Sequence, residues 1–174
     1  MKTGIRIIGI DDAPFRRGDR ETVLVAIVMR YGKVEDALVT RVTVDGDDST
    51  DQIIKLLKKK YGNQGKVVFV HSITLAGLNV VDIDKISKEL NCGVVCITDR
   101  KVRGTALKST LARKFPHKLS LLKEIFKIGR YYISYSGITY SEAVGLVRKI
   151  GYEPVRVADI FARCIKNATN IKYE

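Results

Sequence analysis

Several residue types are scarce in this chain of 174 residues, and each shortage narrows the possible functions. The sequence contains no tryptophan, three prolines, two histidines and three cysteines. Cys92 and Cys96 are too far apart for a CxxC redox pair, and no histidine near them could complete a zinc site. No apolar run approaches the ~20 residues of a membrane span, so no membrane partner is expected. Because the first expected strand begins at Gly4, we see no room for a signal peptide and expect a cytoplasmic protein.

Acidic residues are nearly absent from one part of the chain, although the whole chain carries a formal net charge of +12. Between Arg100 and Arg130 the sequence has ten lysine or arginine residues and a single acid, Glu124. Six acids gather instead between Glu35 and Asp51. This segregation favours an anionic partner, and we expect DNA or RNA. The alternative is a solvated, lysine-rich surface that only keeps the protein in solution. The sequence leaves open which nucleic acid binds, and in what oligomeric state.

The hydrophobic pattern predicts one α/β domain over residues 1–174. Two β-branched runs flank the hairpin turn Tyr31-Gly32, so the first three strands are expected to be antiparallel neighbours. The alternation of strand and helix that follows predicts parallel crossovers. The expected strands are 4–10, 21–31, 33–44, 66–71, 93–98 and 131–135, and the expected helices are 49–61, 82–90, 105–114, 118–128, 139–151 and one beginning near 154.

Asp11 leaves the carboxyl end of the first expected strand and is the first candidate for chemistry. Two or three convergent carboxylates can hold Mg²⁺ or Mn²⁺ against a phosphodiester. Asp45 and Asp48 precede the first helix and are candidates for the other metal ligands and for catalysis, although Asp is also ordinary in such a turn. His71 ends the fourth strand and is a further catalytic candidate, with a hydrogen-bonded structural role as the alternative.

Other polar residues are expected to support this site or to contact phosphate. Asp12 is expected to point to the opposite face from Asp11, Asn79 to fix a loop and Asp82 to cap the next helix. A supporting role at the site is left open for all three residues. Guanidinium groups pair bidentately with phosphate, which favours basic residues close to the site as nucleic-acid contacts. The residues expected to bind nucleic acid are Arg16, Arg17, Arg20, Arg100, Lys101 and Arg103.

The order of elements is the ribonuclease H-like pattern: three antiparallel strands, a helix, then parallel strands, with Asp11 on the first. Three segments carry a closer resemblance, namely 9–12 (GIDD), 43–50 (TVDGDDST) and above all 77–83 (GLNVVDI). They resemble the archaeal domain-of-unknown-function family 99, which is similar to endonuclease V. The resemblance spans essentially the full chain and implies a ribonuclease H-like mixed sheet with flanking helices. It also implies that Asp11 matches the metal ligand of the first strand, and Asp45 or Asp48 the acid before the first helix.

Two departures from the family pattern shape the functional prediction. His71 stands where family members often have Asp, and imidazole is a poor ligand for Mg²⁺. No counterpart exists of the Pro-Tyr-Ile-Pro wedge with which endonuclease V probes damaged DNA. We therefore predict a nucleic-acid-binding protein with an endonuclease V-like fold, whose nuclease activity, if present, is weak or impaired and depends on Mg²⁺ or Mn²⁺. The alternatives are a non-catalytic DNA- or RNA-binding module and a protein-interaction subunit with a vestigial metal site.

Overall fold

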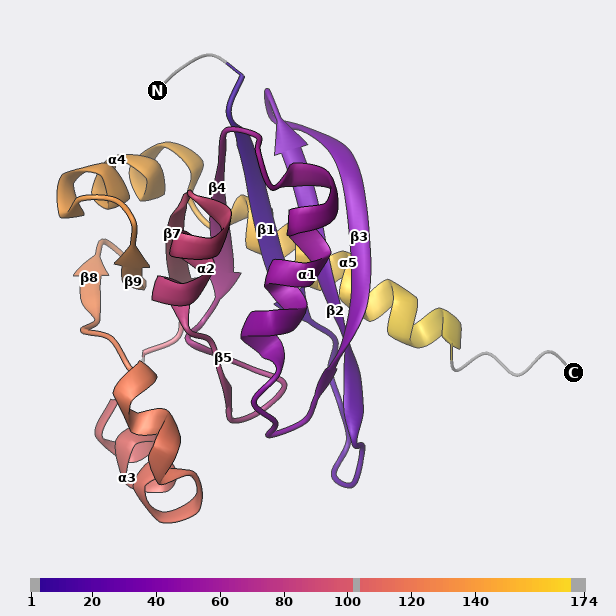
Figure 1. Ribbon diagram of the computed structural model, residues 1–174, viewed down its shortest axis with the longest axis vertical. Helices are drawn as coiled ribbons and strands as arrows, with labels where there is room; N and C mark the ends of the chain where they lie inside the picture. The colour runs from indigo at the N-terminus through magenta and orange to yellow at the C-terminus, as the bar shows by residue number, and fades with distance from the viewer. Residues whose placement is uncertain (1–3, 102–103, 170–174) are drawn as a thin grey trace, which may run out of the picture.

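A seven-stranded mixed sheet forms the middle layer of the computed structural model, which describes residues 4–101 and 104–169 (Figure 1). The strand order is β3-β2-β1-β4-β7-β9-β8. β1, β2 and β3 are antiparallel, β1, β4 and β7 are parallel, and β9 returns antiparallel to β7. The strands are β1 (Arg6–Asp12), β2 (Glu21–Arg30), β3 (Lys33–Thr43), β4 (Lys66–His71), β7 (Gly93–Thr98), β8 (Phe126–Ile128) and β9 (Tyr131–Ser136).

Helices cover both faces of this sheet, with α1 and α2 in front of it and α5 behind it in Figure 1. The middle strand β2 is therefore almost continuously apolar, because Leu24 faces the core shared with α1 and α2 while Val25 faces α5. The helices are α1 (Ser49–Tyr61), α2 (Ile83–Leu90), α3 (Gly104–Lys114), α4 (Tyr140–Ile150) and α5 (Glu153–Thr169). Within the described residues, no helix combines the length and apolar character needed to cross a bilayer.

The start of α5 packs directly on β1 because Gly9 has no side chain. A Cβ atom at Gly9 would lie 2.0 Å from the carbonyl oxygen of Pro154, far inside contact distance. Ile7, Gly9 and Asp11 alternate with Ile8 and Ile10 along β1, so Asp11 points to the same face as Gly9. The close approach at Gly9 thus brings α5 toward Asp11.

The prediction of three antiparallel strands followed by parallel ones is confirmed, and one predicted helix is wrong. Residues 118–128 do not form the single α-helix that was predicted. A short 3-10 helix, η1 (Pro116–Leu121), is followed by strand β8, which pairs with β9. A short hairpin that the sequence pattern did not predict, β5 (Thr74–Leu75) with β6 (Asn79–Val80), lies beyond the end of β4. Helix α3, η1 and the hairpin all lie at the end of the sheet toward which β4 points (Figure 1).

Candidate functional site

Asp11 and His71 meet at the carboxyl ends of two neighbouring parallel strands. Ile10 of β1 pairs with Val70 of β4, so the next residue of each strand lies side by side. The Oδ1 atom of Asp11 is 2.8 Å from Nδ1 of His71 and also accepts a hydrogen bond from the backbone N–H of Asp12. Asp11 is 3% exposed, whereas the His71 side chain remains 27% exposed. The pair therefore joins a buried carboxylate to an imidazole that solvent can reach.

Burial and mutual attraction act in opposite directions on this pair. Burial raises the pKa of the Asp11 carboxyl, and the hydrogen bond and charge of His71 offset only part of that effect. Burial lowers the pKa of His71, but its hydrogen bond to Asp11 and the charges of Asp11 and Asp12 outweigh the burial, so the net pKa of His71 is raised. Each group of the pair therefore holds its proton to a higher pH than the same group would in water.

Asp12 adds a second, partly buried carboxylate beside the first. Burial and then the charge of Asp11 raise the pKa of Asp12 to about 7, although a backbone hydrogen bond from Ala76 works in the opposite direction. Ala76 belongs to the turn of the β5–β6 hairpin and has a positive φ of 42°. The hairpin therefore reaches the carboxylate at the end of β1.

Two residues from the α4–α5 region complete the surroundings of Asp11, and neither was predicted from the sequence. The ring of Tyr152 meets His71 edge-on at 5.8 Å between centroids. Burial, followed by the charges of Asp11, Asp99 and Asp159, raises the pKa of Tyr152. Asp159 also contributes to the raised pKa of Asp11. One signal was available, since Asp159 lies four residues after the buried Val155 and hence on the same side of α5.

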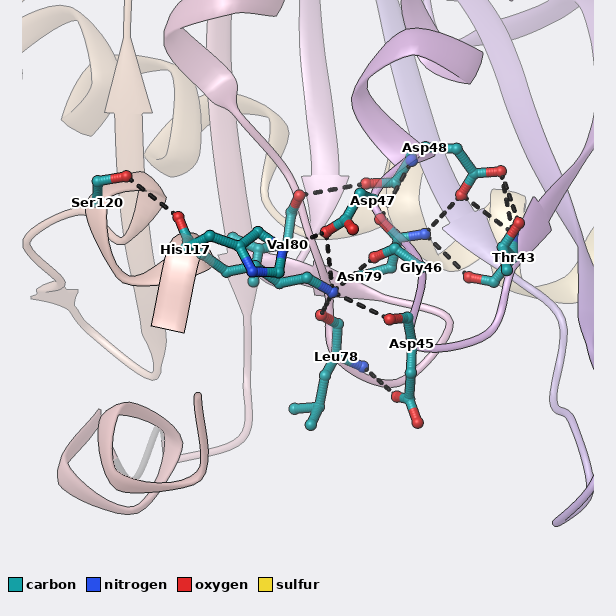
Figure 2. Close-up of polar contacts among 12 residues, drawn as sticks. Thr43, Asp45, Gly46, Asp47, Asp48, Leu78, Asn79, Val80, His117 and Ser120 are labelled. Atoms are coloured by element: carbon teal, nitrogen blue, oxygen red, sulfur yellow. Dashed lines mark hydrogen bonds and ion pairs between the residues drawn. The ribbon is translucent and has the colours of Figure 1, made fainter. Parts of the chain in front are cut away.

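Asp45 and Asp48 form a polar cluster with Thr43, Leu78 and Asn79 (Figure 2), and their role as metal ligands stays a prediction. Asp45 Oδ1 accepts the backbone N–H of Leu78 at 2.8 Å. The Asp48 carboxylate accepts hydrogen bonds from the backbone and hydroxyl of Thr43. Across residues 4–101 and 104–169 no group of three or more His, Cys, Asp or Glu side chains could hold a metal ion. These two acids fix the loop before α1.

The segments 43–50 and 77–83 contact each other through Asn79. Its side chain donates to the Thr43 carbonyl at 2.9 Å and to the Asp48 carboxylate at 2.7 Å, and it accepts the Ser49 N–H at 3.1 Å. Gly77 has a φ of +86°, and a Cβ there would lie 2.3 Å from Asp45 Oδ1. The Gly-Leu-Asn sequence thus locks the hairpin to the loop before α1.

Asp82 acts as the N-cap of α2 by accepting the Lys85 N–H at 2.9 Å, as the sequence predicted. A supporting role for it at the site around Asp11 stays a prediction.

Five of the six basic residues expected to contact phosphate are exposed on two loops. Arg16, Arg17 and Arg20 lie in the loop that follows Asp12. Arg100 and Lys101 follow β7, and the charge of Arg100 acts on His71. Arg103 lies outside the described residues. Nucleic-acid binding by these residues remains a prediction.

Comparison with known proteins decides the family. The model of the Endonuclease dU family matches residues 3–166. The chain belongs to this family. A UPF0215 protein of Archaeoglobus fulgidus is 34% identical over 171 residues, covering 92% of this chain and 93% of that protein. The resemblance to a family of archaeal proteins is thus confirmed.

Solved structures extend the likeness to the fold. A crystal structure of a protein of unknown function from Archaeoglobus fulgidus superimposes with a TM-score of 0.83 at 33% identity, covering 92% of this chain and 98% of that one. Endonuclease V of Ciona intestinalis, solved with a DNA that contains inosine followed by ribo-adenosine, gives a TM-score of 0.63 at 14% identity, covering 96% and 88%. The chain therefore has the fold of endonuclease V, as the family resemblance implied.

Proposed function

We propose that this chain is a divalent-metal-dependent endonuclease centred on Asp11, and that deoxyuridine in DNA is the lesion to test first. The observation that carries the proposal is the buried Asp11 carboxylate at the end of β1, hydrogen-bonded to the solvent-accessible imidazole of His71. The family name supplies the lesion, and the endonuclease V fold supports phosphodiester hydrolysis.

The carboxylates at this site fit a divalent ion that binds together with substrate. Asp11 and Asp12 both have raised pKa values because of their burial, and a nearby cation would offset the cost of charging them. Mg²⁺ in phosphoryl-transfer sites takes one or two carboxylates and completes its shell with water and substrate phosphates, so the Asp11 carboxylate would be a sufficient protein ligand. When bound, such an ion supplies Lewis-acid activation of the phosphodiester and a more acidic water.

His71 and Arg100 are the basic groups that we assign to the reaction. With Nδ1 held by Asp11, Nε2 of His71 is the nitrogen that exchanges a proton with a substrate oxygen. In its protonated form, with Nδ1–H donating to Asp11, the imidazole can donate its other proton from Nε2 to the leaving oxygen. Arg100 is exposed near this imidazole and is assigned to the phosphate on the cleaved strand.

The test compares the native chain with Asp11→Asn on end-labelled DNA duplexes that carry one deoxyuridine, one deoxyinosine or no lesion, and on the matching RNA. We expect Mn²⁺ or Mg²⁺ to support nicking beside deoxyuridine and a chelator to abolish it. Asp11→Asn should lower the single-turnover rate at least about a hundredfold, since even groups that only support metal ligands cost 10–100-fold when removed.

The matched control is Asp51→Asn, because Asp51 is an exposed carboxylate on α1 whose side chain is 68% exposed. It should cleave at the native rate. Equal cleavage by Asp11→Asn and the native chain would refute the assignment of Asp11, and so would native protein that leaves every substrate intact in both metals.

One observation favours a second candidate, a non-catalytic nucleic-acid-binding module. The described residues hold no cluster of three metal ligands, and His71 occupies a position beside Asp11 where another carboxylate would strengthen metal binding. His71→Asp separates the two candidates. If the native site is merely incomplete, the variant gains cleavage and binds Mn²⁺ more tightly by titration calorimetry, whereas an active native enzyme loses rate because its proton donor is removed.

A further inference from the structure

The segment formed by α3 and η1, residues 104–121, carries positive charge without compensating acids, and we call it the basic arm. No Asp or Glu occurs between Arg100 and Lys123. Lys108, Arg113 and Lys114 are exposed on α3, and none of the three forms an ion pair within the part of the chain that the structure describes. Their charges are therefore available to an external anion.

Lys118 of the basic arm has a different role, because it anchors the arm to the rest of the fold. Its side chain is 1% exposed, and Nζ donates to the backbone carbonyl oxygens of Asp45 at 3.0 Å, Gly46 at 2.7 Å and Leu78 at 2.9 Å. The same ammonium lies 4.1 Å from the centroid of the Phe115 ring. All three donors of the ammonium are thus used inside the protein.

A second contact holds the same junction from the solvent side. Nε2 of His117 lies 3.0 Å from Asp47 Oδ1, and Lys118 Nζ lies 3.2 Å from the same oxygen. Figure 2 shows His117 of the arm beside the loop from Asp45 to Asp48 and the Leu78–Val80 strand. The arm is therefore held in a defined position by polar contacts to two loops.

The arm lies at the same end of the molecule as the candidate site. Figure 1 shows α3 beyond the end of the sheet toward which β4 points. A short chain of contacts connects the two: Lys118 binds the Asp45 carbonyl, the Asp45 N–H donates to the Ala76 carbonyl at 2.8 Å, and the Ala76 backbone also hydrogen-bonds the Asp12 carboxyl. A polyanion that reaches the site from this side meets the basic arm next to it.

We infer that the basic arm binds the phosphate backbone of duplex nucleic acid that flanks the cleavage site, through Lys108, Arg113 and Lys114. The inference rests on the proposed function for the position of the duplex. An anionic membrane is disfavoured, because a helix that lies on a bilayer needs an exposed apolar face. Among the described residues the exposed large hydrophobics all lie outside the arm: Phe15, Tyr31, Val34, Val39, Tyr140, Ile160 and Phe161. The arm offers positive charge without an exposed apolar face, which suits contacts to backbone phosphates that do not depend on the base sequence.

The test replaces Lys108, Arg113 and Lys114 together with glutamine, which removes the charge and keeps helix propensity. The matched control replaces three other exposed lysines with glutamine: Lys55, Lys59 and Lys88 on α1 and α2. Both variants have the same net charge. Fluorescence anisotropy measures binding to a labelled, undamaged DNA duplex, in chelator, over a series of salt concentrations.

We expect the arm variant to bind at least about tenfold more weakly at low salt. Its salt slope should be smaller by about three, because each phosphate of duplex DNA that the protein neutralises contributes ~0.9 to the slope. The control variant should match the native chain. Because the duplex has no lesion and no metal is present, this result stands or falls separately from the Asp11 cleavage test.

Three outcomes would overturn the inference. They are native affinity and slope in the arm variant, equally weakened binding by the arm and control variants, and a native chain that does not bind the duplex. The arm would be assigned to membranes instead if two results were found together. The native chain would bind phosphatidylserine vesicles and the arm variant would not, while both proteins bound the duplex equally.

Discussion

Lys118→Met offers the sharpest test of how the basic arm is held to the fold. The substitution keeps a long apolar stem but removes the ammonium from the carbonyl oxygens of Asp45, Gly46 and Leu78. A buried acceptor left without its donor costs about 1–3 kcal/mol. These three penalties are partly offset, because the variant no longer buries a charge, and burying a charge itself costs several kcal/mol. We therefore expect a net decrease of about 3 kcal/mol in the free energy of unfolding.

Equilibrium unfolding in urea at pH 7 measures this decrease, with Lys114→Met as the matched control. Lys114 is exposed on α3, so its replacement should change stability by less than about 0.5 kcal/mol. In a chain of this length, a decrease of about 3 kcal/mol corresponds to a fall in melting temperature of roughly 6–12 °C. Equal stability of the two variants would refute the reasoning, because the three carbonyl contacts would then contribute nothing that methionine packing cannot replace.

Two further changes test the packing and the electrostatics around Asp11. Gly9→Ala places a methyl group against the Pro154 carbonyl, so it should lower the free energy of unfolding in urea by about 3 kcal/mol. The control is Gly145→Ala in α4, where no atom lies near the Cβ position. It should raise the free energy of unfolding by about 0.5–1 kcal/mol. The pKa of Asp12 is raised from 3.8 to about 7 by burial and by the charge of Asp11, so the unfolded chain releases this proton first and stability falls as pH rises from 4 to 7. At pH 8 in chelator, Asp12→Asn should therefore be more stable than the native chain by roughly 2 kcal/mol after allowing for solvent screening. At pH 4 the two proteins should be equally stable. The reasoning would be contradicted if the difference in unfolding free energy between the two proteins were the same at both pH values.

Local sequence signals predicted most of the fold because their physical causes are local. The turn at Tyr31-Gly32 joins β2 to β3, and a capping box formed by Thr139 and Glu142 begins α4 where the sequence predicted a helix. Residues 118–128 were predicted wrongly for a long-range reason. Lys118 is buried by carbonyl groups distant in sequence, and β8 exists because it pairs with β9. Neither partner is visible in the helical periodicity of that segment.

The candidate site divides in the same way. Asp11 and His71 could be found because each ends a buried strand, and parallel neighbours bring their ends together. Asp159 could not, because its approach depends on α5 packing at Gly9. The hydrogen bond from Asn79 to Asp48 could not be predicted either, because the two residues lie about thirty positions apart in the sequence.

Burial separates the structural cations of this chain from those that can meet a polyanion. In the described residues Lys66 and Lys118 are the two buried cations, and each directs its ammonium to three backbone carbonyl oxygens. Both hold loops and neither can reach a phosphate. The net charge of +12 therefore overstates the charge available for binding, and the salt slope of the native chain should follow the exposed residues near the site. Asp11, by contrast, is a buried acid, and the exposed residues Arg16, Arg17 and Arg20 lie in the loop that follows β1. Under the proposed function, the exposed cations would contact the phosphate backbone while the buried Asp11 carboxylate would hold the metal ion.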